Sequence, residues 1–80
     1  MAKTLFFAQA RQAAGCPEAD WPNAQDADAE ALWIWLGRQF PGLSKIRQGT
    51  RLARNGRYLE EGERFAANDE IALLPPVSGG

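Results

Sequence analysis

The sequence predicts a single small domain of the mixed α+β class, and three observations support this. Two short apolar runs, residues 5–8 and 71–74, lie close to the two ends of the chain. Between them, residues 29–40 place apolar side chains at the period of an α-helix. Asn55-Gly56 then separates two short segments and is the strongest local signal for a β-hairpin. Strands near both ends with a helix between them indicate a helix packed on a sheet.

The N-terminal third is expected to contain a strand, a helical turn and a weaker strand. Residues 3–9 form the first strand, because their apolar run is bounded by polar residues. Residues 11–15 form one helical turn that Gly15 closes. Residues 16–22 contain two prolines, so any strand there lies at an edge of the sheet.

The central helix has the clearest pattern. Either Asp26 or Asp28 can cap its N-terminus, and Pro41-Gly42 should end it. One face is apolar, with Trp33 at its margin, and it consists of Ala29, Leu32, Leu36 and Phe40.

Three strands are expected after the helix. Residues 51–54 and 57–60 flank the Asn55-Gly56 turn, and residues 70–74 form the last strand after a turn at Asn68-Asp69. The first and last strands are the most continuously apolar, as in strands buried on both faces, so we expect them side by side and parallel in the centre of the sheet. A helix of about four turns covers one face. Among several possible topologies, this order favours the β-grasp (ubiquitin-like) arrangement.

Composition excludes many kinds of chemistry. The 80 residues include no histidine, so histidine bases and histidine metal sites are absent. The single cysteine, Cys16, cannot form an internal disulfide or alone hold a metal, and is expected to be a partly buried thiol. No metal site is therefore expected. Without a signal peptide or a long apolar run, the chain is expected in the cytoplasm, with no membrane partner.

Charge is balanced overall, at −1, but is unevenly distributed along the sequence. Residues 31–59 contain no acid and six bases, namely Arg38, Lys45, Arg47, Arg51, Arg54 and Arg57. Three interpretations stay open: a solvated face, a docking surface for an acidic protein, and a nucleic-acid surface. The last is the least favoured, because the bases lack interleaved aromatic residues, and no nucleic-acid partner is predicted.

The last six residues carry no charge. Pro75-Pro76 cannot donate ladder hydrogen bonds and favours an extended chain, so the sheet should end at Leu74. Gly79-Gly80 has no Cβ and could enter a narrow channel. A frayed terminus is the alternative.

This ending resembles that of the molybdopterin synthase small subunit, the MoaD family. Residues 75–80 (Pro-Pro-Val-Ser-Gly-Gly), following residues 69–74, are similar to the family's C-terminus, and residues 5–11 are similar to its first strand and turn. Asn55 and residues 61–65 also fall where the family carries similar residues. The similarity spans the chain and is weaker in its middle third.

The resemblance implies a covalent sulfur carrier. An ATP-dependent activating enzyme would adenylate the carboxylate of Gly80, since a carboxylate is a poor electrophile and an acyl-adenylate has a good leaving group. A sulfur donor system would then convert it to a thiocarboxylate. The tail would deliver sulfur to a cyclic pterin in the large catalytic subunit of molybdopterin synthase, within a heterotetramer. Apart from the transient AMP adduct and the sulfur on Gly80, no cofactor is implied.

Residue roles follow from the resemblance. Gly80 carries the acyl group, Gly79 provides clearance, and a partner-binding arm consists of Pro75, Pro76, Val77 and Ser78. The chain would divide into a β-grasp domain, residues 1–74, and a flexible carrier tail, residues 75–80. From their apolar runs, we expect Phe7, Leu73 and Leu74 to belong to the core or its rim.

Trp33, Ile34 and Trp35 depart from the family pattern, which has more polar residues there. Ile34 points nearly opposite the apolar face of the helix. These residues either pack within the core or form an exposed apolar patch, which would be a possible extra interface.

Two alternative functions stay open. A thiamine-pathway sulfur carrier or a ubiquitin-like protein modifier would have the same fold and ending, and only the acceptor would differ. A non-catalytic protein-binding module is an alternative of another class. A stand-alone enzyme is the least favoured, so catalytic side chains are expected in the large subunit.

Overall fold

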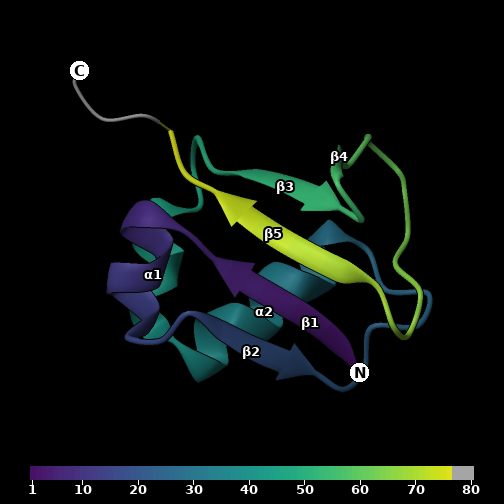
Figure 1. Cartoon of the computed structure of the whole chain (residues 1–80), viewed down its shortest axis with the longest axis horizontal. Helices are drawn as coiled ribbons and strands as arrows, with labels where there is room; N and C mark the ends of the chain where they lie inside the picture. The colour runs from purple at the N-terminus through teal and green to yellow at the C-terminus, as the bar shows by residue number, and fades with distance from the viewer. Residues whose placement is uncertain (77–80) are drawn as a thin grey trace.

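The structure is a computed structural model, and it describes residues 1–76 (Figure 1). In chain order, these residues form the elements β1 (Ala2–Phe6), α1 (Ala8–Ala14), β2 (Glu18–Trp21), α2 (Ala29–Gln39), the 3₁₀ helix η1 (Pro41–Ile46), β3 (Arg51–Arg54), β4 (Arg57–Tyr58) and β5 (Glu70–Leu74). None of the described helices is long and apolar enough to cross a membrane.

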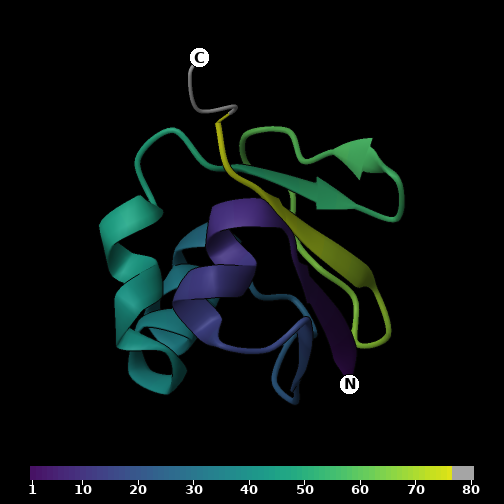
Figure 2. The same ribbon diagram turned by 60° about the vertical axis from the view of Figure 1, so that its left-hand side comes forward.

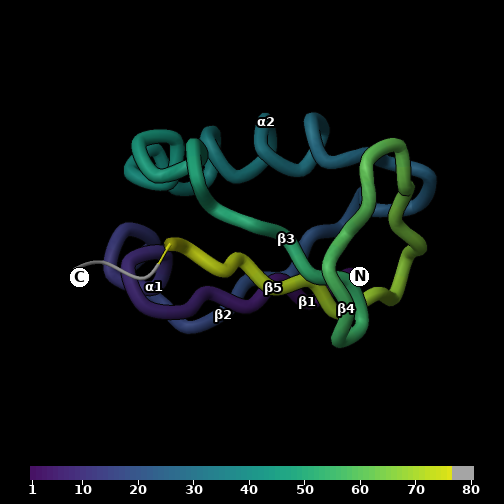
Figure 3. The backbone as a smooth tube through the Cα atoms, turned by 90° about the horizontal axis from the view of Figure 1, so that it is seen from above, coloured from purple at the N-terminus to yellow at the C-terminus, as the bar shows by residue number. Residues whose placement is uncertain are grey.

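The strands form one mixed sheet in the order β2-β1-β5-β3-β4. The first and last strands, β1 and β5, are parallel and lie next to each other in its interior, as the sequence predicts. The other pairs are antiparallel. Together with α2 on one side of the sheet, this is the β-grasp arrangement (Figures 1 and 3).

The core lies between α2 and the sheet. Asp28 caps α2 by accepting a hydrogen bond from the backbone N–H of Ala31 at 2.9 Å. Leu32 and Leu36 then point at the sheet and are fully buried. On the sheet side they face buried side chains of β1 and β5, including Phe6, Ile71 and Leu73.

One expectation about the sheet is wrong. The central strands are not buried on both faces, because α2 and η1 cover only one of them (Figure 3). Along β5, Ile71 and Leu73 are buried, whereas Ala72 and Leu74 are only partly buried. The apolar run in β5 therefore includes two residues, Ala72 and Leu74, on a sheet face that no helix covers. From the sequence alone, such a run is expected only in a strand covered on both faces.

The helical segments also differ from expectation. The helix α2 has 11 residues, fewer than four turns, and Pro41 begins a 3₁₀ helix instead of a loop. Proline is tolerated at a first helical position because its missing N–H would have no partner there. The first helix is likewise longer than the predicted turn at residues 11–15, since α1 begins at Ala8. The strand before it is correspondingly shorter at its end, because β1 stops at Phe6 and not at residue 9. Gly15 closes α1 in the left-handed conformation, as predicted.

The hairpin forms as predicted, although β4 is short. Asn55 and Gly56 both have positive φ, at 52° and 86°, which a type I′ turn requires. β4 spans only Arg57–Tyr58, after which the backbone N–H of Leu59 donates to the Leu52 carbonyl at 2.9 Å. β2 is an edge strand, as predicted, and Pro17 and Pro22 lie directly before and after it.

Candidate functional site

The C-terminal segment leaves the sheet where three strands have their ends together. Leu73 pairs with Phe6, the last residue of β1, and Leu74 pairs with Arg51, the first residue of β3. Figures 1 and 2 show the end of β5 beside the loop that precedes β3, with the start of α1 nearby. These strand ends therefore surround the point where Pro75 follows the sheet.

The loop before β3 supports the base of the tail. A Cβ on Gly49 would lie 3.5 Å from Cγ of Pro76, so the ring of this proline packs over the glycine. Gly49 has a φ of 86°, a conformation that glycine adopts without steric cost. The hydroxyl of Thr50 donates to the Ile46 carbonyl and ties the loop to η1. Pro75 is partly buried and Pro76 is exposed.

The remaining predicted tail residues, Val77, Ser78, Gly79 and Gly80, lie outside the described residues. Their roles stay predictions, as does the division of the chain into a domain and a carrier tail.

Phe7, Leu73 and Leu74 occupy different environments. Leu73 is fully buried and belongs to the core. Phe7 is 46% exposed, because it leaves β1 in extended conformation and caps α1. Leu74 is partly buried beside Arg51. Leu73 thus lies in the core, as one of the two expected positions, whereas Phe7 and Leu74 lie at its rim, next to the point where the chain leaves the sheet.

The open face of the sheet carries a row of apolar side chains that the sequence analysis did not identify. The strand register aligns Leu5 with Ala72, Ala72 with Ala53, and Ala53 with Tyr58. We call these four residues the apolar row. Glu18 of β2 continues the row at the opposite end from Tyr58. The alternation of side chains along β5 was enough to predict that Ala72 and Leu74 share a face. It could not predict which residues of β1 and β3 lie next to them, because that depends on the pairing of strands distant in sequence.

A shallow hollow adjoins the row near the tail. It has a volume of about 490 Å³ and is lined by Ala53, Gly56, Arg57, Tyr58 and Leu74. The guanidinium of Arg51 lies over the ring of Tyr58, 3.9 Å from its centroid, a cation–π contact. The hollow is thus lined mostly by apolar residues, with Arg57 in its lining and Arg51 stacked on its Tyr58.

A polar cluster fixes the hairpin to β5. Asp69, almost completely buried, accepts hydrogen bonds from Arg54 Nε at 2.5 Å, from Asn55 Nδ2 at 2.9 Å and from the Ala66 backbone N–H at 2.7 Å. Burial by itself would raise the pKa of Asp69, but these hydrogen bonds outweigh it and hold the pKa below its ordinary value. Glu63 also pairs with Arg54. The role of Asn55 in this cluster was not evident from sequence.

The six bases of residues 31–59 do not form one surface. Arg47 pairs with Glu30 and lies over the ring of Trp33, while Arg54 belongs to the Asp69 cluster. Arg51 and Arg57 lie at the margin of the hollow. The other two are exposed on the helical side, namely Arg38 in α2 and Lys45 in η1.

Of the two alternatives left open for Trp33, Ile34 and Trp35, packing against the core holds for the two tryptophans and an exposed apolar surface only for Ile34. Trp33 is buried, with 8% of its surface exposed. Trp35 is partly buried and stacks on Trp21, with ring centroids 6.0 Å apart. Only Ile34 is substantially exposed, at 50%. Two helix faces are covered because β2 and the adjoining loop bring Trp21 against α2, which periodicity cannot reveal.

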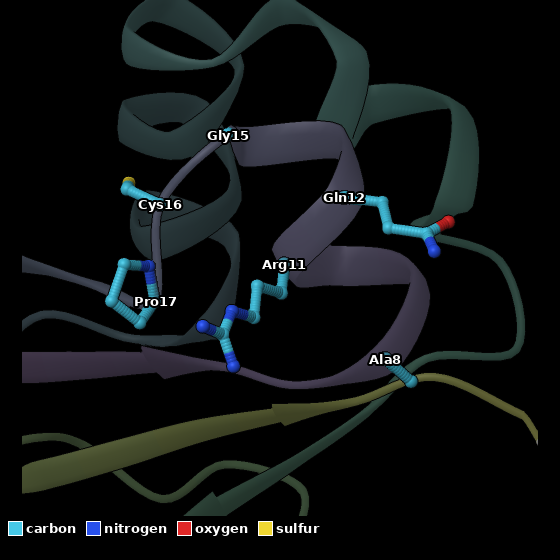
Figure 4. A pocket seen from close by; sticks show the side chains of 6 residues that line it. All are labelled: Ala8, Arg11, Gln12, Gly15, Cys16 and Pro17. Atoms are coloured by element: carbon cyan, nitrogen blue, oxygen red, sulfur yellow. The ribbon is translucent and has the colours of Figure 1, made fainter.

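A second hollow lies along α1, with a volume of about 600 Å³ (Figure 4). Arg11 extends along it toward Pro17, whereas the sulfur of Cys16 points away from Arg11. Cys16 is partly buried, as predicted. This hollow contains one cationic group and no second feature that would select a ligand. Among residues 1–76, no group of three or more potential metal ligands comes together.

Comparisons with known proteins agree with this geometry. The family model described as "ThiS family" matches residues 4–80. The molybdopterin synthase sulfur carrier subunit of Caenorhabditis briggsae is 38% identical, over 98% of this chain and 95% of that protein. The human subunit of the same name is 31% identical, over 98% and 92%. The crystal structure of SAMP1 from Haloferax volcanii has a TM-score of 0.85 and 31% identity, covering 99% of this chain and 98% of that one.

Proposed function

Because the chain belongs to the ThiS family of ubiquitin-like proteins, which includes the sulfur carriers it resembles, we propose that it is the sulfur-carrier subunit of a molybdopterin synthase. The observation that supports this most directly is its similarity, at 31–39% identity over nearly its whole length, to subunits of that name. The β-grasp domain is the scaffold, and residues 75–80 are the carrier arm.

The chemistry takes place at the carboxylate of Gly80. This carboxylate attacks the α-phosphate of ATP in an activating enzyme, which releases pyrophosphate and leaves an acyl-adenylate. A sulfide equivalent from a donor system then displaces AMP and leaves a thiocarboxylate. Gly79 has no side chain to obstruct either active site. The AMP adduct and the sulfur are transient, so the chain needs no resident cofactor.

Acid–base catalysis belongs to the partner enzymes in this proposal. The chain has no histidine, and the carboxylate of Asp69 is occupied by three hydrogen bonds. In the large catalytic subunit, the thiocarboxylate supplies sulfur for the dithiolene of molybdopterin. We place this chemistry in the cytoplasm.

The open face supports docking near the tail. Phe7, Leu74 and Tyr58 expose apolar surface beside the point where the chain leaves the sheet. A partner that draws the tail into its active site would cover this surface, and burial of the apolar row would add to the affinity.

Intact mass spectrometry tests the proposal. The chain is incubated with ATP, its activating enzyme and sulfide, and then with the large subunit and the cyclic pterin. We expect a mass gain corresponding to one oxygen replaced by sulfur at Gly80, which is lost on transfer to the pterin. No gain, when the same enzyme preparation loads another carrier, would refute the carrier function and favour a non-catalytic binding module.

A protein modifier is the second candidate, because SAMP1, whose fold this chain shares so closely, is described as a small archaeal modifier protein. Its acceptor would be a lysine amine instead of a pterin. Conjugates between Gly80 and lysine side chains in cell extracts, with no transfer of sulfur to the pterin, would favour this function. A thiamine-pathway carrier would form the thiocarboxylate but would also leave the pterin unchanged.

A further inference from the structure

A four-residue turn, residues 47–50, joins η1 to β3 and lies beside the base of the tail (Figure 2). The backbone N–H of Thr50 donates to the Arg47 carbonyl at 3.1 Å and closes the turn. Gly49 is its third residue and has a φ of 86°, the sign that a type II turn requires at this position. A Cβ on Gly49 would lie 3.5 Å from Cγ and 3.8 Å from Cδ of Pro76. The turn is therefore in contact with the second residue after the sheet.

The strand register explains why this contact forms. β3 and β5 are antiparallel, and their pairing places Arg51 opposite Leu74. Two residues further along each chain, the same alignment brings Gly49 opposite Pro76. Proline has no N–H to donate, so a ladder hydrogen bond from Pro76 is impossible and the packing of its ring on Gly49 continues the alignment instead. The base of the tail thus follows the line of β5 for two residues beyond the sheet.

The turn is held to the helical layer at both of its ends. The Arg47 guanidinium donates to both carboxylate oxygens of Glu30 in α2, with 3.2 Å between Nη1 and Oε2. It also lies over the ring of the buried Trp33, 5.7 Å from the centroid. At the other end, the Thr50 hydroxyl donates to the carbonyl of Ile46, which packs against the core. These contacts fix the position of Gly49 relative to α2.

A fixed base lowers the cost of using the tail. A segment that enters a partner's active site loses conformational freedom, and this loss is smaller when its first residues are already oriented. Pro75 and Pro76 extend the orientation set by the turn, because their rings fix φ.

We propose that Gly49 is a positioning residue for the carrier reaction: the turn of residues 47–50 holds the ring of Pro76 and thereby sets the direction in which the Gly80 carboxylate is presented to the partner enzymes. The inference rests on the proposed function. It assigns part of the orientation of the tail to the domain itself, and Arg47 supports that orientation by holding the turn to α2.

Two glycines give a matched pair of variants. Gly49→Ala and Gly62→Ala place alanine at φ values of 86° and 85°, so both turns are strained to a similar extent and must shift to relieve the strain. Among residues 1–76, nothing lies within 4 Å of a Cβ at Gly62, so the second variant strains a turn that does not touch Pro76. Thermal melts of the full-length chains establish that the two variants are folded and equally destabilised.

Nuclear Overhauser spectra and loading kinetics measure the effect. Wild type and Gly62→Ala should show a cross-peak between the Hα protons of Gly49 and the ring protons of Pro76, which Gly49→Ala should lose. In thiocarboxylate formation with the activating enzyme, ATP and sulfide, Gly49→Ala should raise the KM for the chain at least about threefold and change kcat by less than about twofold. Gly62→Ala should leave both constants within about twofold of wild type.

A double-mutant cycle separates positioning from a general structural effect. Pro76→Ala removes the ring that the turn holds, so adding Gly49→Ala to Pro76→Ala should raise KM no further. Additive effects of the two substitutions would overturn the proposal, since Gly49 would then act by a route that does not include Pro76.

A second pair of variants leaves both glycines in place and applies if Gly49→Ala does not fold. Arg47→Met removes the ion pair with Glu30, and Arg64→Met removes a hydrogen bond of 2.8 Å to the Asp26 carbonyl, in a loop that does not contact Pro76. Arg47→Met should weaken the cross-peak and raise KM, whereas Arg64→Met should do neither.

The remaining outcomes distinguish this inference from the proposed function. Absence of the cross-peak in wild type, or an equal rise in KM for Gly49→Ala and Gly62→Ala, would refute the positioning role while thiocarboxylate formation by wild type upheld the carrier function. If wild type forms no thiocarboxylate with an enzyme preparation that loads another carrier, the proposed function fails and the positioning role fails with it.

Discussion

Asp69 adds side-chain hydrogen bonds to the backbone pairing that joins the hairpin to β5. Its carboxylate accepts hydrogen bonds from two side chains of the hairpin region, Arg54 and Asn55, and from the backbone at Ala66. Asn55 thereby has two functions, since it forms the turn with positive φ and its side chain also accepts from the Glu70 backbone N–H at 2.9 Å. A single buried carboxylate thus helps to hold the hairpin in place beside β5.

Asp69→Asn should lower the free energy of unfolding by about 2 kcal/mol at neutral pH, because a charged acceptor of buried hydrogen bonds is lost. The folded-state pKa of Asp69 is depressed, so its stabilisation is complete above the pKa of the unfolded chain and is lost as pH falls through the folded-state pKa. The difference between wild type and variant should therefore shrink below about pH 4. Urea melts across this pH range measure it.

Asp20→Asn is the matched control, because Asp20 is exposed in β2 and makes no ion pair within residues 1–76. It should change the free energy of unfolding by less than about 0.5 kcal/mol. If the difference in free energy of unfolding between wild type and Asp69→Asn grew as the pH fell, it would contradict the assigned hydrogen bonds.

The helix α2 shows how far an element can be understood from its own sequence. Its N-cap and its buried stripe follow from local rules, and Leu32 and Leu36 lie where a 3.6-residue period places them. The burial of Trp33 and Trp35 has another cause, since Arg47 covers one and Trp21 stacks on the other. These partners come from segments distant in sequence.

Leu36→Ala and Ile34→Ala form a matched pair on this helix. Leu36 is fully buried, so its truncation should cost about 2–5 kcal/mol through lost burial and a residual cavity. Ile34 is half exposed, so its truncation should cost less than about 1 kcal/mol. Chemical denaturation compares the two. A large cost for Ile34→Ala, or a change in sedimentation at equal stability, would reveal that Ile34 is buried in an interface.

At the scale of the whole molecule, the described core lies apart in sequence from the carboxylate that we propose as the reactive group. The residues of the core cluster lie between Ala2 and Leu73, and the last residue of the sheet is Leu74. The Gly80 carboxylate that we propose as the carrier group follows both. Stability and carrier chemistry should therefore be altered independently.

A chain that ends at Pro76 should keep its free energy of unfolding within about 0.5 kcal/mol of the full-length value, because no core residue is removed. It should form no thiocarboxylate when treated with ATP, activating enzyme and sulfide. Urea melts and intact mass measure the two properties. If truncation lowered the free energy of unfolding by more than about 1 kcal/mol, twice the expected limit, the removed residues would contribute to the stability of the domain.

Local chemistry was sufficient to predict most of the elements. The type I′ turn needs positive φ at two residues, which Asn55-Gly56 supplies. Gly15 closes α1 for an equally local reason. The continuously apolar strands are central as predicted, although burial on both faces, the reason for that prediction, is not found. The carrier role of residues 75–80 stays a prediction, which rests on this ending together with the length of the chain and its opening strand.

Tertiary structure alone decided which surfaces are open and what they contact. The apolar row joins residues as distant as Leu5 and Ala72, and the hollow joins Tyr58 to Leu74. Such neighbours depend on strand register and on which face the single helical layer covers, and neither is encoded in the periodicity of one segment. The same holds for the bases at residues 31–59: Arg47 and Arg54 pair with distant acids, while Arg51 stacks on Tyr58 and Arg57 lines the hollow.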